Sequence, residues 1–382
     1  MKVVIAIDSF KGNLSSMSAG NIASAAVKNF VPDAEVKIYP LADGGEGTVE
    51  AITEGLNGKI IDVEVTGPLG TKVSAQYGKI NQTAIIEMAT AAGLPLVPES
   101  ERNPLNTTTY GLGELILNAA EDGCRDFIIG IGGSATNDCG LGMLTALGFE
   151  FRDHNGFKIG VFGRDLQDIS EIETSKVSSI IKECNFKIAC DVNNPLTGAT
   201  GCSAIYAPQK GATPEIISQM DNWIANFAAI STKALNIENL STAGDGAAGG
   251  LGFAFRTFLN GKLVKGIELV LDLIGIADEL RNADLLITGE GKLDEQSLMG
   301  KAPVGVSKLA KKVNKKIITV AVCGSAANEA VKVHEVGIDA YFPILQKSMT
   351  IAEAMNIETA EFNLSRTIEE ILRLFVAQQK IL

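Results

Sequence analysis

The stretch "KVVIAIDSFKG", Lys2–Gly12, joins a short β-branched apolar run to a loop that carries an acid, a hydroxyl group and a lysine. A run of this length and composition predicts a buried β-strand over 2–7. A helical pattern follows at about 18–30, and a second strand is expected over 34–41. Strands that alternate with helices are typical of a parallel, doubly wound sheet, because parallel strands need a crossover between them.

The N-terminal part continues with a helix at 45–56 and a strand at 59–65. The C-terminal third repeats this alternation of short apolar strands and helices. There, strands are expected at 283–289, 315–324 and 339–345, with helices at 303–313, 325–336 and 358–379. The two ends of the chain therefore predict one Rossmann-like or flavodoxin-like parallel sheet that is discontinuous in sequence.

The middle of the chain has apolar patterns of its own. Residues 66–88 look like strands joined by short turns. Further strands are expected at 125–133 and 186–191, with helices at 109–121, 139–147 and 214–234. We therefore predict two dissimilar α/β domains, the first formed by 1–65 and 281–382, and the second, 66–280, inserted into it.

Composition excludes several classes of function. The 382 residues carry a net charge of −12 with no basic run, which argues against a nucleic-acid partner. Six cysteines without a CxxC pair and only two histidines argue against a zinc site. The N-terminal apolar run is too short for a signal peptide or a membrane span, so we expect a cytoplasmic protein with no membrane partner.

Five polar loops follow predicted strands, and these loops carry the main functional signal. Each contains glycine or a turn residue together with acids, amides, hydroxyls or lysines. In open α/β sheets, ligands bind beyond the carboxyl ends of the strands. The loops are 8–12, 42–48, 130–138, 191–195 and 287–303.

Two of these loops suit anions. Gly132 and Gly133, before Ser134, place backbone N–H groups near a predicted helix start, which favours an anion through unpaired donors and the helix dipole. The alternative is a helix cap on an ordinary turn. Gly44 and Gly45 can hold a phosphate or a carboxylate, although the following Glu46 can equally serve only to favour a helix N-terminus.

Asp191 follows the apolar strand "FKIAC", where we expect its carboxylate to be partly desolvated and able to act as a base. The alternative is an Asx-turn or a cap at the strand exit.

The stretch "ITGEGKLDEQSLMGKAP", 287–303, resembles a phosphate loop but fails the P-loop pattern, because Ala302 follows Gly300-Lys301. Its glycines are expected to let the backbone approach a ligand. A formal GxGxxG at 244–249 lacks a preceding strand and is weak support for a dinucleotide site. No GxSxG, SxxK or HExxH motif is present, so hydrolysis through a Ser or Cys nucleophile is poorly supported. Anion-binding backbone, lysines and carboxylates remain, and phosphoryl transfer to a small hydroxy compound needs that set.

Taken together, the loops resemble the bacterial glycerate kinase family, the class that includes the enzymes of the glyoxylate and galactarate pathways. The resemblance implies two dissimilar α/β domains and transfer of the γ-phosphoryl group of ATP to D-glycerate with Mg²⁺, in the class that gives 2-phosphoglycerate. The matching segments are "IAIDSFKGNLS" (5–15), "PLADGGEGT" (40–48), "IGIGGSATNDCGLGML" (129–144), "ACDVNNPLTG" (189–198), "GAAGGLG" (246–252) and "LLITGEGKLDEQSLMGKAPVGV" (285–306).

Residue roles are hypotheses from the chemistry of the loops rather than from the resemblance. Asp191 is expected to orient or deprotonate the attacking hydroxyl, Lys11 to bind the charge of glycerate, and Lys292 or Lys301 to neutralise phosphate. Asp294 and Glu290 are the candidate Mg²⁺ ligands, with Asp8 as a further one. The predicted substrate- or phosphate-binding residues are Asp8, Ser9, Gly44, Gly45, Gly132, Gly133, Ser134, Asn193 and Lys301.

Several alternatives stay open from the sequence. One is a glycerate 3-kinase that gives 3-phosphoglycerate. Another is a non-catalytic protein whose two lobes bind a small hydroxy acid. A nicotinamide-dependent dehydrogenase rests only on 244–249. The sequence also leaves open whether the protein forms a homo-oligomer and which loop binds nucleotide.

Overall fold

The computed structural model describes residues 1–42, 44–45, 47–237, 242–298 and 300–379. The chain divides into two compact units. The first contains Met1–Asp43, Glu50–Asn57 and Ile267–Leu382, and the second contains Gly44–Val49 and Gly58–Gly266. The predicted domain boundaries at Val65 and Leu280 stay predictions, and each unit is described by itself below.

The first unit is built on a five-stranded parallel sheet. Its strand order is β13-β12-β11-β1-β2. From β1 the chain adds β2 on one side, and the later strands β11, β12 and β13 follow on the other side, so the direction reverses between β1 and β11. Neighbouring strands are in regular register, with Ile5 beside Ile287 and Ile287 beside Val320. This order is that of flavodoxin-like folds, so the predicted parallel-sheet fold is confirmed. The strands are β1 (Lys2–Ile7), β2 (Glu35–Ile38), β11 (Leu285–Leu293), β12 (Ile318–Ala326) and β13 (Ala340–Pro343).

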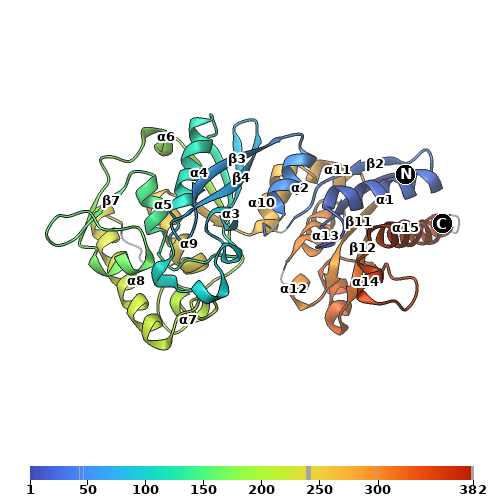
Figure 1. Cartoon of the computed structure of the whole chain (residues 1–382). Coiled ribbons are helices and arrows are strands. Elements are labelled where there is room, and N and C mark those ends of the chain that lie inside the picture. Colours follow the sequence, from blue (N-terminus) through green and yellow to red (C-terminus); the bar gives the residue numbers. More distant parts are fainter. Residues whose placement is uncertain (43, 46, 238–241, 299, 380–382) are drawn as a thin grey trace. The chain divides into compact units, whose positions relative to one another are not determined.

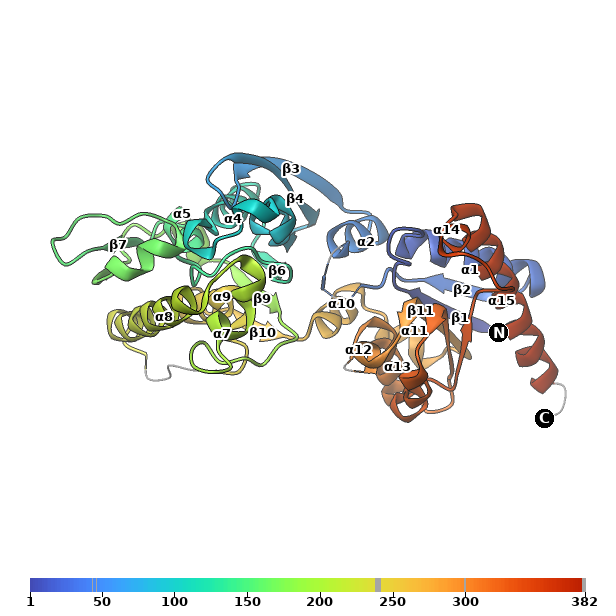
Figure 2. The ribbon, with the colours of Figure 1, turned by 60° about the horizontal axis from the view of Figure 1, so that its bottom comes forward.

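Helices cover both faces of this sheet (Figures 1 and 2). On one face, α1 (Ser16–Phe30) and α15 (Ile357–Gln379) pack on alternate residues of the strands, including Val3, Ile5 and Ile287. On the other face, α13 (Ala302–Val313) contributes Val304 to a second cluster with Ala321 and Cys323. Burial on both faces explains why these strands are nearly continuous apolar runs.

The second unit contains a six-stranded mixed sheet. Its order is β10-β9-β6-β5-β4-β3. The pairs β3–β4 and β4–β5 are antiparallel, whereas β5, β6, β9 and β10 run parallel. The strand predicted at 59–65 therefore belongs to this sheet and not beside the N-terminal strands. The strands are β3 (Lys59–Thr66), β4 (Lys72–Ile80), β5 (Thr83–Glu87), β6 (Asp126–Gly130), β9 (Asn185–Ala189) and β10 (Lys262–Val264).

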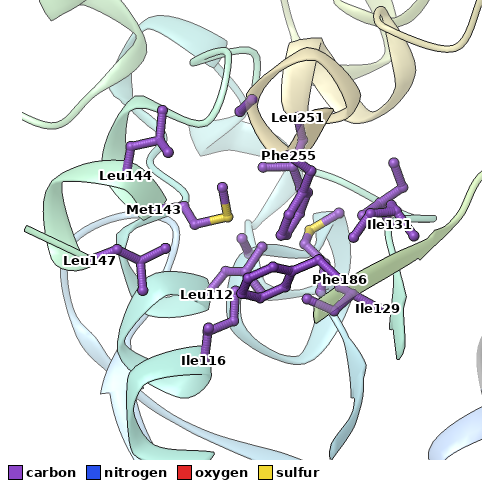
Figure 3. Packing of buried hydrophobic residues seen from close by; sticks show 14 of the residues in the cluster. Leu112, Ile116, Ile129, Ile131, Met143, Leu144, Leu147, Phe186, Leu251 and Phe255 are labelled. Carbon is purple, nitrogen blue, oxygen red and sulfur yellow. The ribbon is translucent and has the colours of Figure 1, made fainter. Parts of the chain in front are cut away.

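The core of the second unit lies between this sheet and three helices, α4 (Tyr110–Glu121), α5 (Leu141–Ala146) and α9 (Ala247–Phe258). Figure 3 shows Leu112 and Ile116 from α4, Met143 from α5, Phe255 from α9 and Phe186 of β9 gathered in this core. The rings of Phe127 and Phe186 stack with their centroids 5.1 Å apart. This apolar packing fixes the strand ends from which the polar loops of this unit emerge.

Local sequence explains where α1 begins and where α8 begins and ends. Ser15 caps α1, since its side chain accepts from the N–H of Ser18. In the same way, Thr213 caps α8 (Pro214–Leu235), Pro214 occupies its first turn, and Asn236 ends it in the left-handed conformation.

Smaller elements complete the two units. The segment predicted as a helix at 325–336 is instead a 3₁₀ helix, Asn328–Val336, because β12 continues to Ala326. In the part of the chain that is described, no helix combines the length and apolar character needed to cross a membrane. The other elements are α2 (Thr48–Gly55), α3 (Ala89–Ala92), α6 (Ser179–Lys182), α7 (Cys202–Tyr206), α10 (Gly266–Ile274), α11 (Ala277–Arg281), α12 (Glu295–Leu298), α14 (Ile351–Ala354), β7 (Glu150–Arg152), β8 (Glu171–Glu173) and five short 3₁₀ turns.

Candidate functional site

The first unit contains a pocket of about 470 Å³ beyond the carboxyl ends of its central strands. The loop after β1 forms one side, the end of β11 another, and β12 with the segment around α14 the rest. The strand order reverses between β1 and β11, which is where doubly wound sheets bind ligands. Seven predicted site residues line this pocket: Asp8, Ser9, Lys11, Glu290, Lys292, Asp294 and Lys301.

Hydrogen bonds to β11 and within the loop hold the loop after β1 in place. The N–H of Asp8 donates to the carbonyl of Gly289 on β11, at 2.9 Å, which extends the parallel pairing by one residue. Asp8 in turn accepts from the N–H of Ser9 at 2.7 Å. Beyond it, Phe10 and Leu14 form an antiparallel bridge. Lys11 therefore stands exposed at the tip of a tight turn that lines the pocket.

The first part of the stretch predicted as a glycine loop, 287–293, is strand. β11 runs to Leu293, so Glu290, Gly291 and Lys292 lie within it. A Cβ on Gly289 would lie 2.2 Å from the carbonyl oxygen of Val322 on β12. The expectation that the glycines serve ligand approach is therefore wrong at Gly289, where glycine allows the two strands to approach.

Charged groups of both signs gather where β11 ends. Lys292 Nζ lies 3.5 Å from Asp294 Oδ2. Asp294 also accepts from the N–H of Gln296 at 3.0 Å, which fixes its carboxylate in a short turn. Lys301, the residue before α13, donates to the side chain of Gln296 at 3.0 Å. Two lysines and a turn-fixed carboxylate thus share one wall of the pocket, where the lysines can pair with phosphate oxygens and the carboxylate can bind a cation.

Glu290 is the most enclosed acid of the pocket, with 8% of its surface exposed. It lies in register with Cys323 of the neighbouring strand. Burial, with the nearby Glu290 carboxylate, raises the pKa of the Cys323 thiol to about 12. Cys323 therefore stays a thiol at neutral pH and is a packing residue rather than a nucleophile.

The composition of the pocket fits a magnesium ion. No group of three or more His, Cys, Asp or Glu residues forms a ready metal cluster in the described ranges. Mg²⁺, however, is usually bound through one or two carboxylates together with water and substrate phosphates. Glu290, Asp294 and Asp8 are the acids that line the pocket and can meet this requirement.

The second unit gathers its predicted residues at another sheet edge, beyond the carboxyl ends of the parallel strands β5, β6, β9 and β10. A Cβ on Gly130 would lie 2.5 Å from the carbonyl oxygen of Gly44, and a Cβ on Gly44 would lie 3.0 Å from Gly266 Cα. Gly44 therefore crosses directly over these strand ends. Gly45 follows it, and the neighbouring Glu46 lies outside the described residues.

Asp191 follows β9 at this edge, and its Oδ1 accepts from the N–H of Gly266 at 3.1 Å. Asp191 and Asn193 are both exposed. The expected partial desolvation of the Asp191 carboxylate is therefore wrong, because the strand ends one residue earlier and the side chain leaves the apolar layer.

Gly132 and Gly133 are exposed next to a buried Ser134. Gly133 has a φ of 71°, and a Cβ on Gly132 would meet open space. The helix expected at 139–147 is α5, which begins at Leu141, seven residues after Ser134. Any anion held here must therefore be bound by the loop itself rather than by a helix dipole.

Lys210 lies beneath this loop and was not foreseen from the sequence. Only 1% of its surface is exposed. Its ammonium donates to Ser134 Oγ at 2.7 Å and to the carbonyl of Thr136 at 2.6 Å. Burial lowers the pKa of Lys210 to about 8. The surrounding sequence, "APQKGATP", has no pattern that distinguishes this lysine from a surface one.

Asp138 anchors the other end of the same loop. It is fully buried and accepts from the N–H and the hydroxyl of Thr109, at 2.8 and 2.7 Å, and from the N–H of Gly142 at 3.2 Å. Burial raises its pKa, and these donors oppose that rise. Asp138 thus ties the loop to the starts of α4 and α5, a structural role that sequence position alone does not reveal.

These features define a class: a two-unit α/β protein whose flavodoxin-like unit has a ligand pocket of lysines and carboxylates, and whose second unit carries exposed glycine loops at a sheet edge. The chain matches the sequence model described as the Glycerate kinase family over residues 3–376. The chain belongs to the glycerate kinase family.

Similar proteins cover nearly the whole chain. A glycerate 2-kinase of Escherichia coli is 45% identical over 96% of this chain and 98% of its own length. A glycerate kinase of Haemophilus influenzae is 44% identical over 98% of both. A crystal structure described as that of a glycerate kinase 2 from Salmonella typhimurium is 43% identical, covers 100% of this chain and 99% of its own, and has a TM-score of 0.91.

Proposed function

We propose that this protein transfers the γ-phosphoryl group of ATP to the 2-hydroxyl of D-glycerate, with Mg²⁺, and gives 2-phosphoglycerate and ADP. The observation that carries the proposal is the pocket at the switch point, whose lysines and carboxylates suit a magnesium nucleotide. Membership of the glycerate kinase family and the name of the E. coli relative support the choice of acceptor and of its 2-hydroxyl.

At phosphorus, the reaction forms one bond and breaks one. The glycerate hydroxyl oxygen attacks the γ-phosphorus, the bond from that phosphorus to the β,γ-bridging oxygen breaks, and ADP leaves with the electron pair. The hydroxyl proton passes to a base. In such a transfer the protein contributes positioning and charge stabilisation rather than covalent chemistry.

In the first unit, we assign Lys11, Lys292 and Lys301 to the phosphate groups, because all three line the same pocket. Glu290 and Asp294 would hold Mg²⁺, which supplies charge neutralisation when it is bound. Asp8 and Ser9 offer further oxygen atoms on the loop after β1. This assignment moves Lys11 from glycerate, its expected partner from sequence, to the nucleotide.

In the second unit, we assign the glycerate carboxylate to the loop of Gly132, Gly133 and Ser134, beneath which Lys210 places a cation. Asp191 orients or deprotonates the attacking hydroxyl, since an exposed carboxylate at a strand end can reach a bound substrate. Gly44, Gly45 and Asn193 border the same sheet edge and complete the proposed substrate-binding set.

The decisive experiment mixes the protein with ATP, Mg²⁺ and D-glycerate and follows the release of ADP. Phosphorus NMR of the product then distinguishes 2-phosphoglycerate from 3-phosphoglycerate. The second product would correct the regiochemistry and leave the kinase assignment intact. Binding of D-glycerate without ADP release would instead favour a non-catalytic binding protein.

The cellular setting is part of the proposal. A glycerate kinase consumes the product of a reaction that reduces or cleaves larger organic acids, so we place this protein in organic-acid catabolism, including glyoxylate metabolism, in the cytoplasm. Fractionation of cells that produce the protein, with ADP-forming activity as the readout, tests the location.

A further inference from the structure

The pocket of the first unit has an apolar wall that the proposed catalytic roles do not use. Leu345, Ile351 and Met355 form this apolar wall, and they are 41%, 83% and 42% exposed. Phe10 and Ile344, both buried, also line the pocket. Three large exposed apolar side chains in a pocket that also contains lysines and carboxylates suit a ligand that is apolar at one end and charged at the other.

Of the two proposed substrates, only the nucleotide has that character. Glycerate carries an oxygen substituent on each of its carbons, so it offers nothing for an apolar surface to bind. ATP combines a flat aromatic base with a triphosphate chain. A cavity of about 470 Å³ is also of the size that ligand pockets provide for molecules larger than a three-carbon acid.

We propose that the apolar wall is the subsite for the purine base of the nucleotide, with the triphosphate directed toward Lys11, Lys292 and Lys301. This inference rests on the proposed function and adds to it the unit of the chain that binds ATP. The wall and the lysines belong to one pocket within the first unit, so a single molecule can contact both.

The segment that carries the wall is held in place. Thr350 and Glu353 form a capping box at the start of α14, in which Thr350 accepts from the N–H of Glu353 at 3.2 Å. Asn13, on the loop after β1, donates to the carbonyl of Ala354 at 3.2 Å. The wall is therefore fastened directly to the loop that presents Lys11, which fixes the spacing between the apolar and the charged ends of the pocket.

The test compares full-length variants by direct binding of ADP and of inorganic triphosphate, measured by calorimetry with Mg²⁺. Ile351→Ser and Leu345→Ser remove apolar surface from the wall. Ile357→Ser is the matched control, because Ile357 is 55% exposed on α15 but does not line the pocket. Each wall variant should bind ADP roughly tenfold more weakly, as expected from losing one buried aliphatic contact.

Inorganic triphosphate lacks a base, so its affinity should be the same for the wall variants, the control and the unmodified protein. In steady-state assays the KM for ATP should rise in the wall variants while the KM for D-glycerate stays unchanged. Unchanged ADP affinity in both wall variants would overturn the inference. An equal loss of ADP and triphosphate affinity would also overturn it, because the wall would then act on the phosphate end.

These readouts separate the subsite from the proposed function. If the protein phosphorylates no glycerate but the wall variants still lose ADP affinity selectively, the base subsite stands and the proposed reaction is wrong. If glycerate is phosphorylated and only the KM for glycerate rises in the wall variants, the reaction stands and the base subsite is wrong.

Discussion

At the scale of single residues, the most informative side chain is Lys210, a lysine buried beneath an exposed glycine loop. Its pKa is lowered from 10.5 to about 8 by burial. The unfolded chain therefore holds its proton more tightly than the folded protein does between these two values. Below pH 8 the buried, charged Lys210 lowers the free energy of unfolding compared with a solvent-exposed lysine at the same position. As the pH rises toward 10, Lys210 loses its proton in the folded protein and this destabilisation disappears.

We therefore predict that the free energy of unfolding of the unmodified protein, minus that of Lys210→Met, increases from pH 7 to pH 10. The expected increase is on the order of a few kcal/mol. Urea unfolding at each pH measures it. Lys308→Met, which removes an exposed lysine on α13, is the control and should give a flat difference. A difference for Lys210→Met that falls as the pH rises would mean that this lysine is stabilised in its charged form.

Asp191 provides a catalytic prediction. If it orients or deprotonates the attacking hydroxyl, Asp191→Asn should lower kcat by about 10²–10⁴-fold while the KM for ATP changes little. Asp62→Asn, at another exposed acid of the same unit, serves as the control. Turnover of Asp191→Asn equal to that of the unmodified protein would remove Asp191 from the reaction.

Asp294 provides a test of the magnesium assignment. Asp294→Asn keeps an oxygen that can accept from the N–H of Gln296 but removes the negative charge. The Mg²⁺ concentration for half-maximal activity should rise roughly tenfold or more, since even the loss of an outer-shell partner has that effect on metal affinity. Glu295→Gln, at the adjacent exposed acid, should leave it unchanged. An identical Mg²⁺ requirement in Asp294→Asn would exclude the metal role.

The residues that sequence could nominate are those whose chemistry is visible without knowing their neighbours. Acids and lysines in glycine loops after strands are of this kind, and Asp8, Lys11, Glu290 and Asp294 do line one pocket. Lys210 could not be found this way, because its burial depends on helices and loops distant in sequence. Asp138 lies in one of the nominated loops, but its burial, and hence its structural role, could not be read from the sequence. The exposure of Asp191 was misjudged for the same reason.

At the scale of elements, the glycines of β11 show how one pattern can have two causes. Gly289 is where β12 approaches most closely, with Val322 O only 2.2 Å from the site of a Cβ. Gly291, two residues later on the same strand, would place a Cβ no closer than 3.6 Å to any neighbour. Sequence alone assigned both glycines to a ligand loop, because strand pairing is not visible in the alternation of apolar residues.

This contrast gives a matched pair of variants. Gly289→Ala should lower the free energy of unfolding by about 1–3 kcal/mol, because the backbone of β12 must move to admit a methyl group. Gly291→Ala should change it much less, since its methyl group makes an ordinary contact. Urea unfolding of both variants measures the difference. Equal destabilisation would show that the cost comes from the alanine itself and not from the close approach of the strands.

At the scale of the whole molecule, alternating strands and helices were enough to predict a flavodoxin-like parallel sheet with an insertion. They were not enough to place β3, because nothing in the sequence "KIIDVEV" shows which of the two sheets this strand joins. The order of the strands decides where a ligand binds. The switch point between β1 and β11 is formed by segments that lie far apart in the sequence, so the local motifs could nominate each loop but not show that the two meet in one pocket.

This topology predicts where nucleotide binding should be felt along the chain. A ligand that binds only the folded state stabilises the structure around its site and slows hydrogen exchange there. With ADP and Mg²⁺, peptides from three distant parts of the sequence should gain protection together, namely those that cover 8–14, 290–301 and 344–355. Peptides from 165–182 in the second unit, far in sequence from every pocket residue, are the internal control.

Hydrogen exchange with mass spectrometry can follow all of these peptides in one experiment, with D-glycerate alone as the matched second ligand. D-glycerate should protect 130–138 and leave 344–355 unchanged, because the apolar wall has no partner on a three-carbon acid. Protection of 130–138 by ADP, with none at 344–355, would place the nucleotide in the second unit and reverse the two assignments. The joint response of 8–14, 290–301 and 344–355 is what a nucleotide at the switch point of a discontinuous sheet requires, because that pocket exists only when both ends of the chain are folded together.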